Sequence, residues 1–174
     1  ETAARFTVRM DLAKQPWFKA PGVVTGEAHV DSAGGRIPGI AFQLGADGLT
    51  VQDAAIRSVN AEGRLDWPVL RIERATLRGT TGEELRGSGG WDFRQKAVID
   101  ATVEGEVRGA ALARWLPASV AFDRLAIEGR AAGPLASMTQ SGRAEVTGLH
   151  LAKLNPMNAK VSWSGRGPEV QSFS

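Results

Sequence analysis

The chain has 174 residues, of which 43% are hydrophobic and 23% charged, a composition that excludes an intrinsically disordered segment. Its 21 basic and 19 acidic residues leave a formal net charge of +2 and are finely interleaved, which argues against the clustered positive charge of a nucleic-acid surface. Cysteine is absent, which excludes disulfides and thiolate metal sites, and no apolar run approaches the roughly 20 residues of a membrane-spanning helix.

The chain starts directly in patterned sequence. Its first methionine is Met10, and Glu1 leads at once into an alternating stretch that ends at Leu12. We therefore expect residues 1–174 to be a single segment of a larger protein, with anchors and targeting signals outside it.

Apolar and polar residues alternate with a period of two along most of the chain, which predicts β-strands with one apolar and one wet face. In chain order, the expected strands are 5–12, 23–31, 37–44, 54–62, 65–78, 85–93, 97–108, 122–130, 142–151 and 158–164. Many short strands with few helices favour an antiparallel all-β architecture.

Glycine-rich pairs separate these strands and predict turns at 34–35, 47–48, 62–63, 79, 89–90, 133–134 and 165–168. One short helix is expected at 110–116, between Gly109 and Pro117, because Leu112 and Leu116 follow helical spacing. A helix this short is not stable alone in water, so it must pack its apolar side on the sheet.

No local motif for catalysis is present. His29 and His150 are the only imidazoles, and both lie in strand-like stretches without a nearby nucleophile or zinc-ligand spacing. Glu83 and Glu84 are interpreted as part of a solvated hairpin loop, and the tryptophans as packing residues rather than base-stacking platforms. We predict no enzyme activity, no cofactor and no metal site. A carbohydrate-active enzyme that uses scattered carboxylates stays a third hypothesis.

The apolar faces of the strands need a cover. An antiparallel sheet buries its apolar side against another sheet, a helix, a partner or a ligand. One short helix is not enough, so the sequence leaves two solutions open. The common solution is a second sheet packed on the first, and the more specific alternative is a curved sheet that encloses lipid tails.

Three stretches resemble the AsmA-like and TamB proteins of Gram-negative envelopes. The stretch Phe122–Leu149 (FDRLAIEGRAAGPLASMTQSGRAEVTGL) is similar to the family's repeat, in which an apolar strand leads through glycine, proline and leucine to another glycine-led strand. The stretch Leu112–Pro117 (LARWLP) resembles the short helix that often precedes this repeat, and Leu65–Gly79 (LDWPVLRIERATLRG) resembles its long strands. The resemblance extends over residues 23–165 and contains no invariant chemical signature.

The resemblance implies an elongated, curved antiparallel sheet, U-shaped with an apolar groove and called a β-taco, in a periplasmic protein anchored in the inner membrane. It implies transport of phospholipid from the inner to the outer membrane and a role in outer-membrane biogenesis. For TamB it also implies a partnership with an Omp85-type barrel, TamA. An anchor and a barrel-binding region are not recognisable in this sequence.

We therefore predict a β-taco segment whose inner face shelters phospholipid acyl chains. The predicted lipid-binding residues share the apolar phase of their strands, and they are Val24, Val30, Phe42, Leu44, Ile99, Val103, Leu125, Ile127 and Val146. A bulge in a strand would reverse this phase. The alternative hypothesis is a structural or interaction module, such as a β-sandwich or β-solenoid of a surface protein. Nucleic acid is not expected as a partner.

Overall fold

The computed structural model describes residues 2–14, 21–32, 38–51, 54–113, 116–151, 155–167 and 169–173. The strands are β1 (Thr2–Asp11), β2 (Val23–Ser32), β3 (Gly39–Val51), β4 (Ala54–Asp66), β5 (Val69–Gly79), β6 (Glu84–Asp92), β7 (Ala97–Arg108), β8 (Val120–Ala121), β9 (Arg124–Pro134), β10 (Thr139–Leu151), β11 (Met157–Arg166) and β12 (Glu169–Phe173). Single helical turns lie at η1 (Leu12–Lys14), α1 (Gly109–Leu112) and η3 (Leu135–Ser137).

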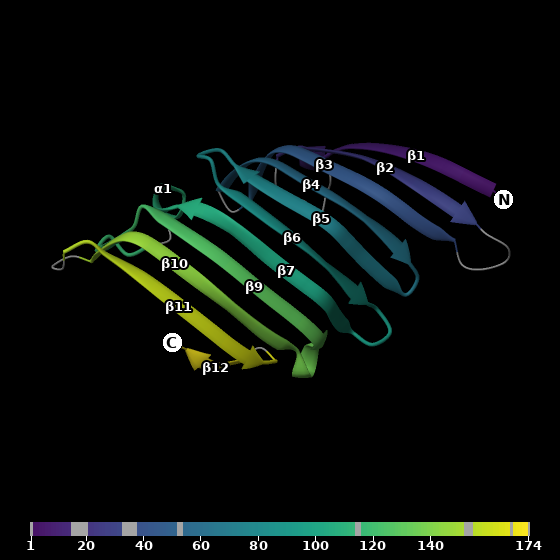
Figure 1. Cartoon of the computed structure of the whole chain (residues 1–174). Coiled ribbons are helices and arrows are strands. Elements are labelled where there is room, and N and C mark those ends of the chain that lie inside the picture. The colour runs from purple at the N-terminus through teal and green to yellow at the C-terminus, as the bar shows by residue number, and fades with distance from the viewer. Residues whose placement is uncertain are drawn as a thin grey trace.

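Neighbours in sequence are neighbours in the sheet. The strands follow the order β1-β2-β3-β4-β5-β6-β7-β9-β10-β11-β12, all described pairs are antiparallel, and β8 pairs with β10 beside this path. Figure 1 shows the strands in one curved layer, with the two termini at opposite ends and α1 at the strand ends. The prediction of a curved antiparallel all-β sheet with one short helix is confirmed. Within the described ranges the strands form one open sheet and not two packed sheets.

Three glycine-containing pairs that we predicted as turns lie inside strands instead. Residues 47–48 belong to β3, 62–63 to β4 and 89–90 to β6. The strands continue through all three pairs: Gly48 and Gly89 adopt positive φ angles of 62° and 152°, and the pair 62–63 lies at a register shift between β4 and β5. The strands are therefore longer than predicted, and β3 and β4 reach 13 residues each.

The stretch 65–78, predicted as a single strand, is interrupted by a turn at Trp67 and Pro68 between β4 and β5. A proline has no N–H group with which to continue the ladder. Trp67 stacks on Phe93, which belongs to the next turn at the same end of the strands, and the ring centroids are 5.3 Å apart. This contact ties two neighbouring hairpin turns together.

The helix is shorter than the predicted 110–116. It begins at Gly109 and ends at Leu112, and residues 114–115 lie outside the described part of the chain. The amide of Gly109 donates to the carbonyl of Asp123 at 3.1 Å, which fixes the start of α1 beside the segment that leads into β9. In the described ranges no helix has the length and apolar character needed to cross a membrane.

Several pairs of long strands contain β-bulges. The register shifts by one residue between Ile72 and Ala75 in β5, between Val98 and Ala101 in β7, and between residues 146 and 149 in β10. An extra residue on one strand bends it and increases its local twist. These bulges therefore contribute to the curvature of the sheet, and they also change which residues share a face.

Candidate functional site: the apolar face of the sheet

A row of small and apolar residues crosses the sheet at right angles to the strands. Residues that pair directly in an antiparallel ladder place their side chains on the same face. Following these pairs from β1 to β11 gives the central row: Val8, Gly26, Leu44, Ala61, Ala75, Gly87, Val103, Gly129, Gly142 and Trp163. No polar side chain interrupts it.

A parallel row two residues along each strand is equally apolar. It consists of Met10, Val24, Ala46, Val59, Leu77, Leu85, Gly105, Ile127, Ala144 and Val161. On the other side of the central row, the pairs place Phe42 opposite Ala28 and Gly63, and beyond them Val30 opposite Ile40. The face is thus built of several adjacent rows, each of which continues from strand to strand.

The predicted inner-face residues come together on this face, with one exception. Val103 and Leu44 lie in the central row, and Val24 and Ile127 lie in the second row. Phe42 and Val30 belong to the rows just described, and Leu125 pairs with Val146 in a further row.

Ile99 does not share this face, and its assignment to it is wrong. The bulge between Val98 and Ala101 shifts the phase of β7, and Asp100 adopts a positive φ of 42° there. Ile99 therefore pairs with Gly90, which in turn pairs with Arg71 on the opposite face. Strict alternation through 97, 99, 101 and 103 fails at this point.

Sequence reasoning missed residues of the same face that lie in strands it had predicted. Leu70, Ile72 and Trp91 pair across β4, β5, β6 and β7 in rows next to the central one. Their apolar character was the available signal. The face on which they lie could not be read from strict alternation, because the bulge after Ile72 places Ala75, three residues later, on the same face.

Little of this face is covered by protein. Among the described residues the buried hydrophobic side chains are Leu12, Ala46 and Ala97, and no large side chain is fully buried. Leu44 and Val103 in the central row are 44% and 42% exposed. A chain of this length ordinarily encloses a core, so the exposure of the central row marks the face as a contact surface.

A hollow of about 350 Å³ opens on the apolar face over β5, β6 and β7. Its walls include Leu70, Ile72, Trp91 and Ala101, and its floor is the glycine backbone around Gly89. An engineered apolar cavity of roughly 150 Å³ takes up benzene. The hollow exceeds that size but is open to solvent rather than enclosed, and its lining offers few hydrogen-bonding groups.

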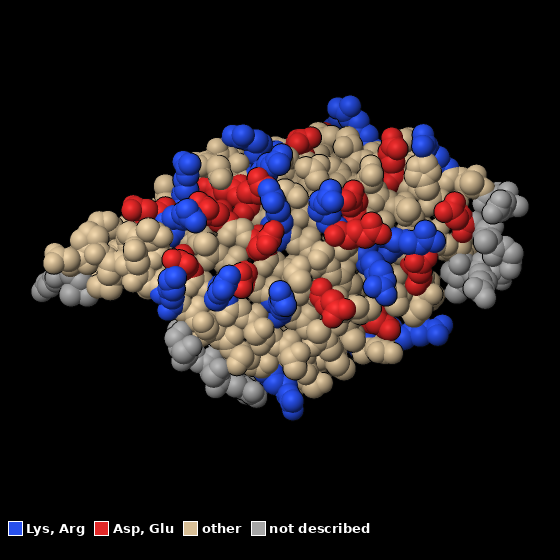
Figure 2. Space-filling model, viewed as in Figure 1, with Lys and Arg blue, Asp and Glu red and all other residues tan. Residues whose placement is uncertain are grey.

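The opposite face is densely charged. Figure 2 shows basic and acidic side chains interspersed over it. The ion pairs include Arg143 with Glu128 at 2.8 Å and Lys160 with Glu145 at 3.3 Å, each joining neighbouring strands. These side chains are mostly exposed, so each pair contributes only about 0–1 kcal/mol. Their effect is to keep this face in water and to leave the apolar face as the one that needs a cover.

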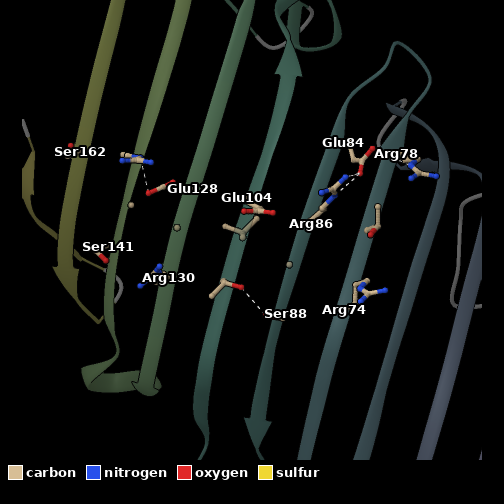
Figure 3. A pocket seen from close by; sticks show the side chains of 17 residues that line it. Arg74, Arg78, Glu84, Arg86, Ser88, Glu104, Glu128, Arg130, Ser141 and Ser162 are labelled. Atoms are coloured by element: carbon tan, nitrogen blue, oxygen red, sulfur yellow. Dashed lines mark hydrogen bonds and ion pairs between the residues drawn. The ribbon is translucent and has the colours of Figure 1, made fainter.

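The charged face also carries the larger hollow, of about 1220 Å³, which extends from β5 to β11. Figure 3 shows its lining, with Glu84 between Arg78 and Arg86 on one side and Glu128 on the other. The hydrogen bond from Arg86 to Glu84, 2.7 Å long, holds the pKa of that carboxyl below its usual value. The larger of the two hollows thus lies on the charged face, and not on the face that we predicted to line a groove. Only the smaller of these two hollows is apolar.

Glu83 is buried, which corrects the prediction that it is solvated. Its carboxylate accepts hydrogen bonds from the hydroxyl of Thr81 and, at 3.1 Å, from the backbone amide of Thr81. Burial raises the pKa of Glu83, but these hydrogen bonds and the positive charge of Arg108 outweigh it, so the pKa lies below its ordinary value. The carbonyl of Glu83 accepts from the amide of Gly79 at 2.9 Å, so this residue closes the turn between β5 and β6.

The rows of the apolar face present aliphatic and aromatic side chains and glycine backbone. The described residues contain no group of three or more His, Asp or Glu that could hold a metal ion. His29 accepts a hydrogen bond from Arg5 at 3.2 Å, and His150 lies opposite Ala121 in the pairing of β10 with β8. Comparisons of the chain with protein-family models, curated proteins and solved structures give no match.

Proposed function

We propose that this chain is a segment of a periplasmic protein of the AsmA-like and TamB type, anchored in the inner membrane. In this proposal its apolar face shelters the acyl chains of phospholipids on their way from the inner to the outer membrane. The single observation that carries the proposal is the set of unbroken apolar rows that cross the sheet without a protein layer over them in the described ranges.

The energetics favour hydrocarbon as the cover. Each methylene withdrawn from water contributes about 0.8 kcal/mol, so full burial of roughly ten methylenes contributes about 8 kcal/mol. Contact on one side only gives about half of that. In the central row such a ligand would contact Leu44, Ala75, Val103 and Trp163. The aliphatic and aromatic surfaces of these side chains carry no hydrogen-bonding groups, so contact with hydrocarbon leaves no polar group without a partner.

Movement along the face needs similar binding at successive strands. Neighbouring strands lie about 4.8 Å apart, and each step along a row replaces one small or apolar side chain by another. Gly129 and Gly142 leave space that the side chains of Val103 and Trp163 occupy, so the residues of this part of the row lie close to one level. A chain that lies along a row therefore meets shallow steps rather than one deep site, which suits transfer better than permanent binding.

Retention of lipid by the purified chain tests the proposal. We expect native mass spectrometry and solvent extraction to detect bound phospholipid after expression in a Gram-negative host. A photo-crosslinking amino acid at Ile127 should attach to the acyl chain, whereas the same group at Ser162, exposed on the charged face, should not. Absence of bound lipid or detergent, or equal crosslinking from both positions, would contradict it.

A further inference from the structure

Three hairpin turns lie side by side at one end of the strands, and Figure 1 shows them along one border of the sheet. They connect β4 to β5, β6 to β7 and β9 to β10, and we call them the turn rim, residues 67–68, 93–96 and 135–138. Backbone hydrogen bonds join each turn to the next. The amide of Phe93 donates to the carbonyl of Pro68 at 3.0 Å, and the amide of Leu135 donates to the carbonyl of Lys96 at 3.1 Å. The turn rim is therefore one connected structure rather than three separate loops.

Each turn of the rim carries a large apolar side chain that is exposed. Trp67, Phe93 and Leu135 are 49%, 42% and 52% exposed. The rings of Trp67 and Phe93 stack, so they form one aromatic surface that extends over two turns. Turns ordinarily carry polar residues and glycine, as the turn at 80–83 (TTGE) does at the opposite end of the strands. Exposed apolar side chains that gather in neighbouring turns mark a contact site.

The turn rim also carries basic side chains that have no acidic partner among the described residues. Arg94 and Lys96 are exposed, and neither makes an ion pair with a described carboxylate. The carboxylate of Asp92 accepts a hydrogen bond from the backbone amide of Arg94 at 2.8 Å, and that of Asp66 lies 2.8 Å from Arg64. The two carboxylates that flank these turns thus have partners of their own, and the charges of Arg94 and Lys96 remain available to a ligand.

The turn rim stays accessible when the sheet is extended. Its turns belong to inner strands of the sheet, between β4 and β10 in the strand order. Further strands at either edge would continue the sheet sideways and leave the ends of these inner strands uncovered. The rim also lies outside the apolar rows, so an inference about it stands apart from the proposed function, and the two can fail separately.

We propose that the turn rim binds the surface of an anionic phospholipid bilayer. In this mode Trp67, Phe93 and Leu135 enter the boundary between headgroups and acyl chains, where tryptophan is enriched in membrane proteins. Arg94 and Lys96 lie beside the lipid phosphates, to which basic residues are attracted. The strands then stand on the membrane with the turn at 80–83 directed away from it.

The mixture of residues on the rim favours a lipid surface over a protein partner. Phe93 shares one turn with Arg94 and Lys96, so apolar and basic side chains alternate over a few residues. Aromatic and aliphatic residues next to Lys and Arg are typical of segments that lie in the membrane interface. The centre of a protein interface is instead depleted of charged residues, lysine in particular.

Single labelled cysteines show which end of the strands meets a membrane, because the chain contains no cysteine of its own. Gln95→Cys places an environment-sensitive dye on the turn rim, and Thr80→Cys places the same dye at the opposite end. With vesicles of equal parts phosphatidylglycerol and phosphatidylcholine, we expect a blue shift at residue 95 and little change at residue 80. Vesicles of phosphatidylcholine alone should bind about tenfold more weakly, because Arg94 and Lys96 lose the anionic surface.

Two results would overturn the proposal. Equal shifts at residues 95 and 80 would show that the turn rim is not the contact. Absence of a shift at residue 95 with the anionic vesicles would exclude a bilayer and point to a protein as the partner.

A matched pair of variants tests the apolar contact. Leu135→Gln removes an exposed aliphatic side chain, whereas Leu135→Met keeps an apolar one. We expect co-sedimentation with the anionic vesicles to weaken about tenfold for Leu135→Gln and to stay unchanged for Leu135→Met. Both variants should keep phospholipid on the apolar face, whereas Val103→Asp should lose that phospholipid and still bind vesicles. Unchanged vesicle binding by a folded Leu135→Gln chain would refute the contact. If Leu135→Gln does not fold, the dye positions decide the question alone.

Discussion

A carboxylate introduced at the centre of the apolar face distinguishes two hypotheses. In one, this face is an open lipid-binding surface; in the other, it is the wall of a closed core. Val103 is the best position for it, because its neighbours in the central row are Gly87 and Gly129, which have no side chains, and its own side chain is 42% exposed. Ser162→Asp is the matched control. Ser162 is exposed and lies on the charged face, in the row of Arg143.

The structure sets the size of each effect. A fully buried valine contributes about 1.5–3 kcal/mol, and Val103 is 42% exposed. Val103→Asp should therefore reduce the free energy of unfolding by only about 1 kcal/mol. A charge against an acyl chain loses water without gaining a partner and costs roughly several kcal/mol. Bound lipid should therefore fall by about tenfold or more, since each tenfold corresponds to about 1.4 kcal/mol.

The assay measures lipid phosphorus per chain after purification, together with urea denaturation of the same samples. We expect Val103→Asp to lose lipid while it stays folded, and Ser162→Asp to keep its lipid. Equal lipid content in the two variants would refute the assignment of the face. Global unfolding of Val103→Asp would show that Val103 packs against protein in a closed core.

Two further predictions concern stability. In Gly142→Val, the new side chain overlaps the ring of Trp163, so we expect a loss of roughly 1–3 kcal/mol in urea denaturation and a shift of tryptophan fluorescence, whereas Gly45→Ala should be nearly neutral. Because the folded pKa of Glu83 is lowered, its contribution is present above the unfolded value of about 4.5 and is lost as the pH falls through the folded pKa. Glu83→Gln should therefore flatten the acid side of the stability–pH curve, and an unchanged slope below pH 4.5 would contradict this account.

Much of the fold was readable from alternation alone. The pattern over 97–108 matches the bounds of β7, and the antiparallel order follows from short connections between successive strands. Pro68 lies inside the predicted strand 65–78 and was a sequence signal against it, because proline within a run argues against a continuous central strand. The turn at this position could therefore have been predicted.

The bulges could not have been predicted in the same way. Asp100 occupies the left-handed region that aspartate tolerates more readily than most residues, yet nothing in its neighbours distinguishes it from the other acidic residues of the strand. Gly89 and Gly90 carry a turn-like signal, and the structure uses them inside β6 opposite this bulge. The face of Ile99 thus depends on a pairing between strands, which the local pattern does not contain.

The most direct test of the central claim uses a phospholipid with a nitroxide near the end of its acyl chain. NMR of the full chain, with methyl groups labelled, measures the broadening that the nitroxide causes at each residue. The account predicts strong broadening at Leu44, Val103 and Ile127 on the apolar face and little at Ala126, which lies on the charged face opposite Glu106. Equal broadening on both faces, or none at the first three residues, would contradict it.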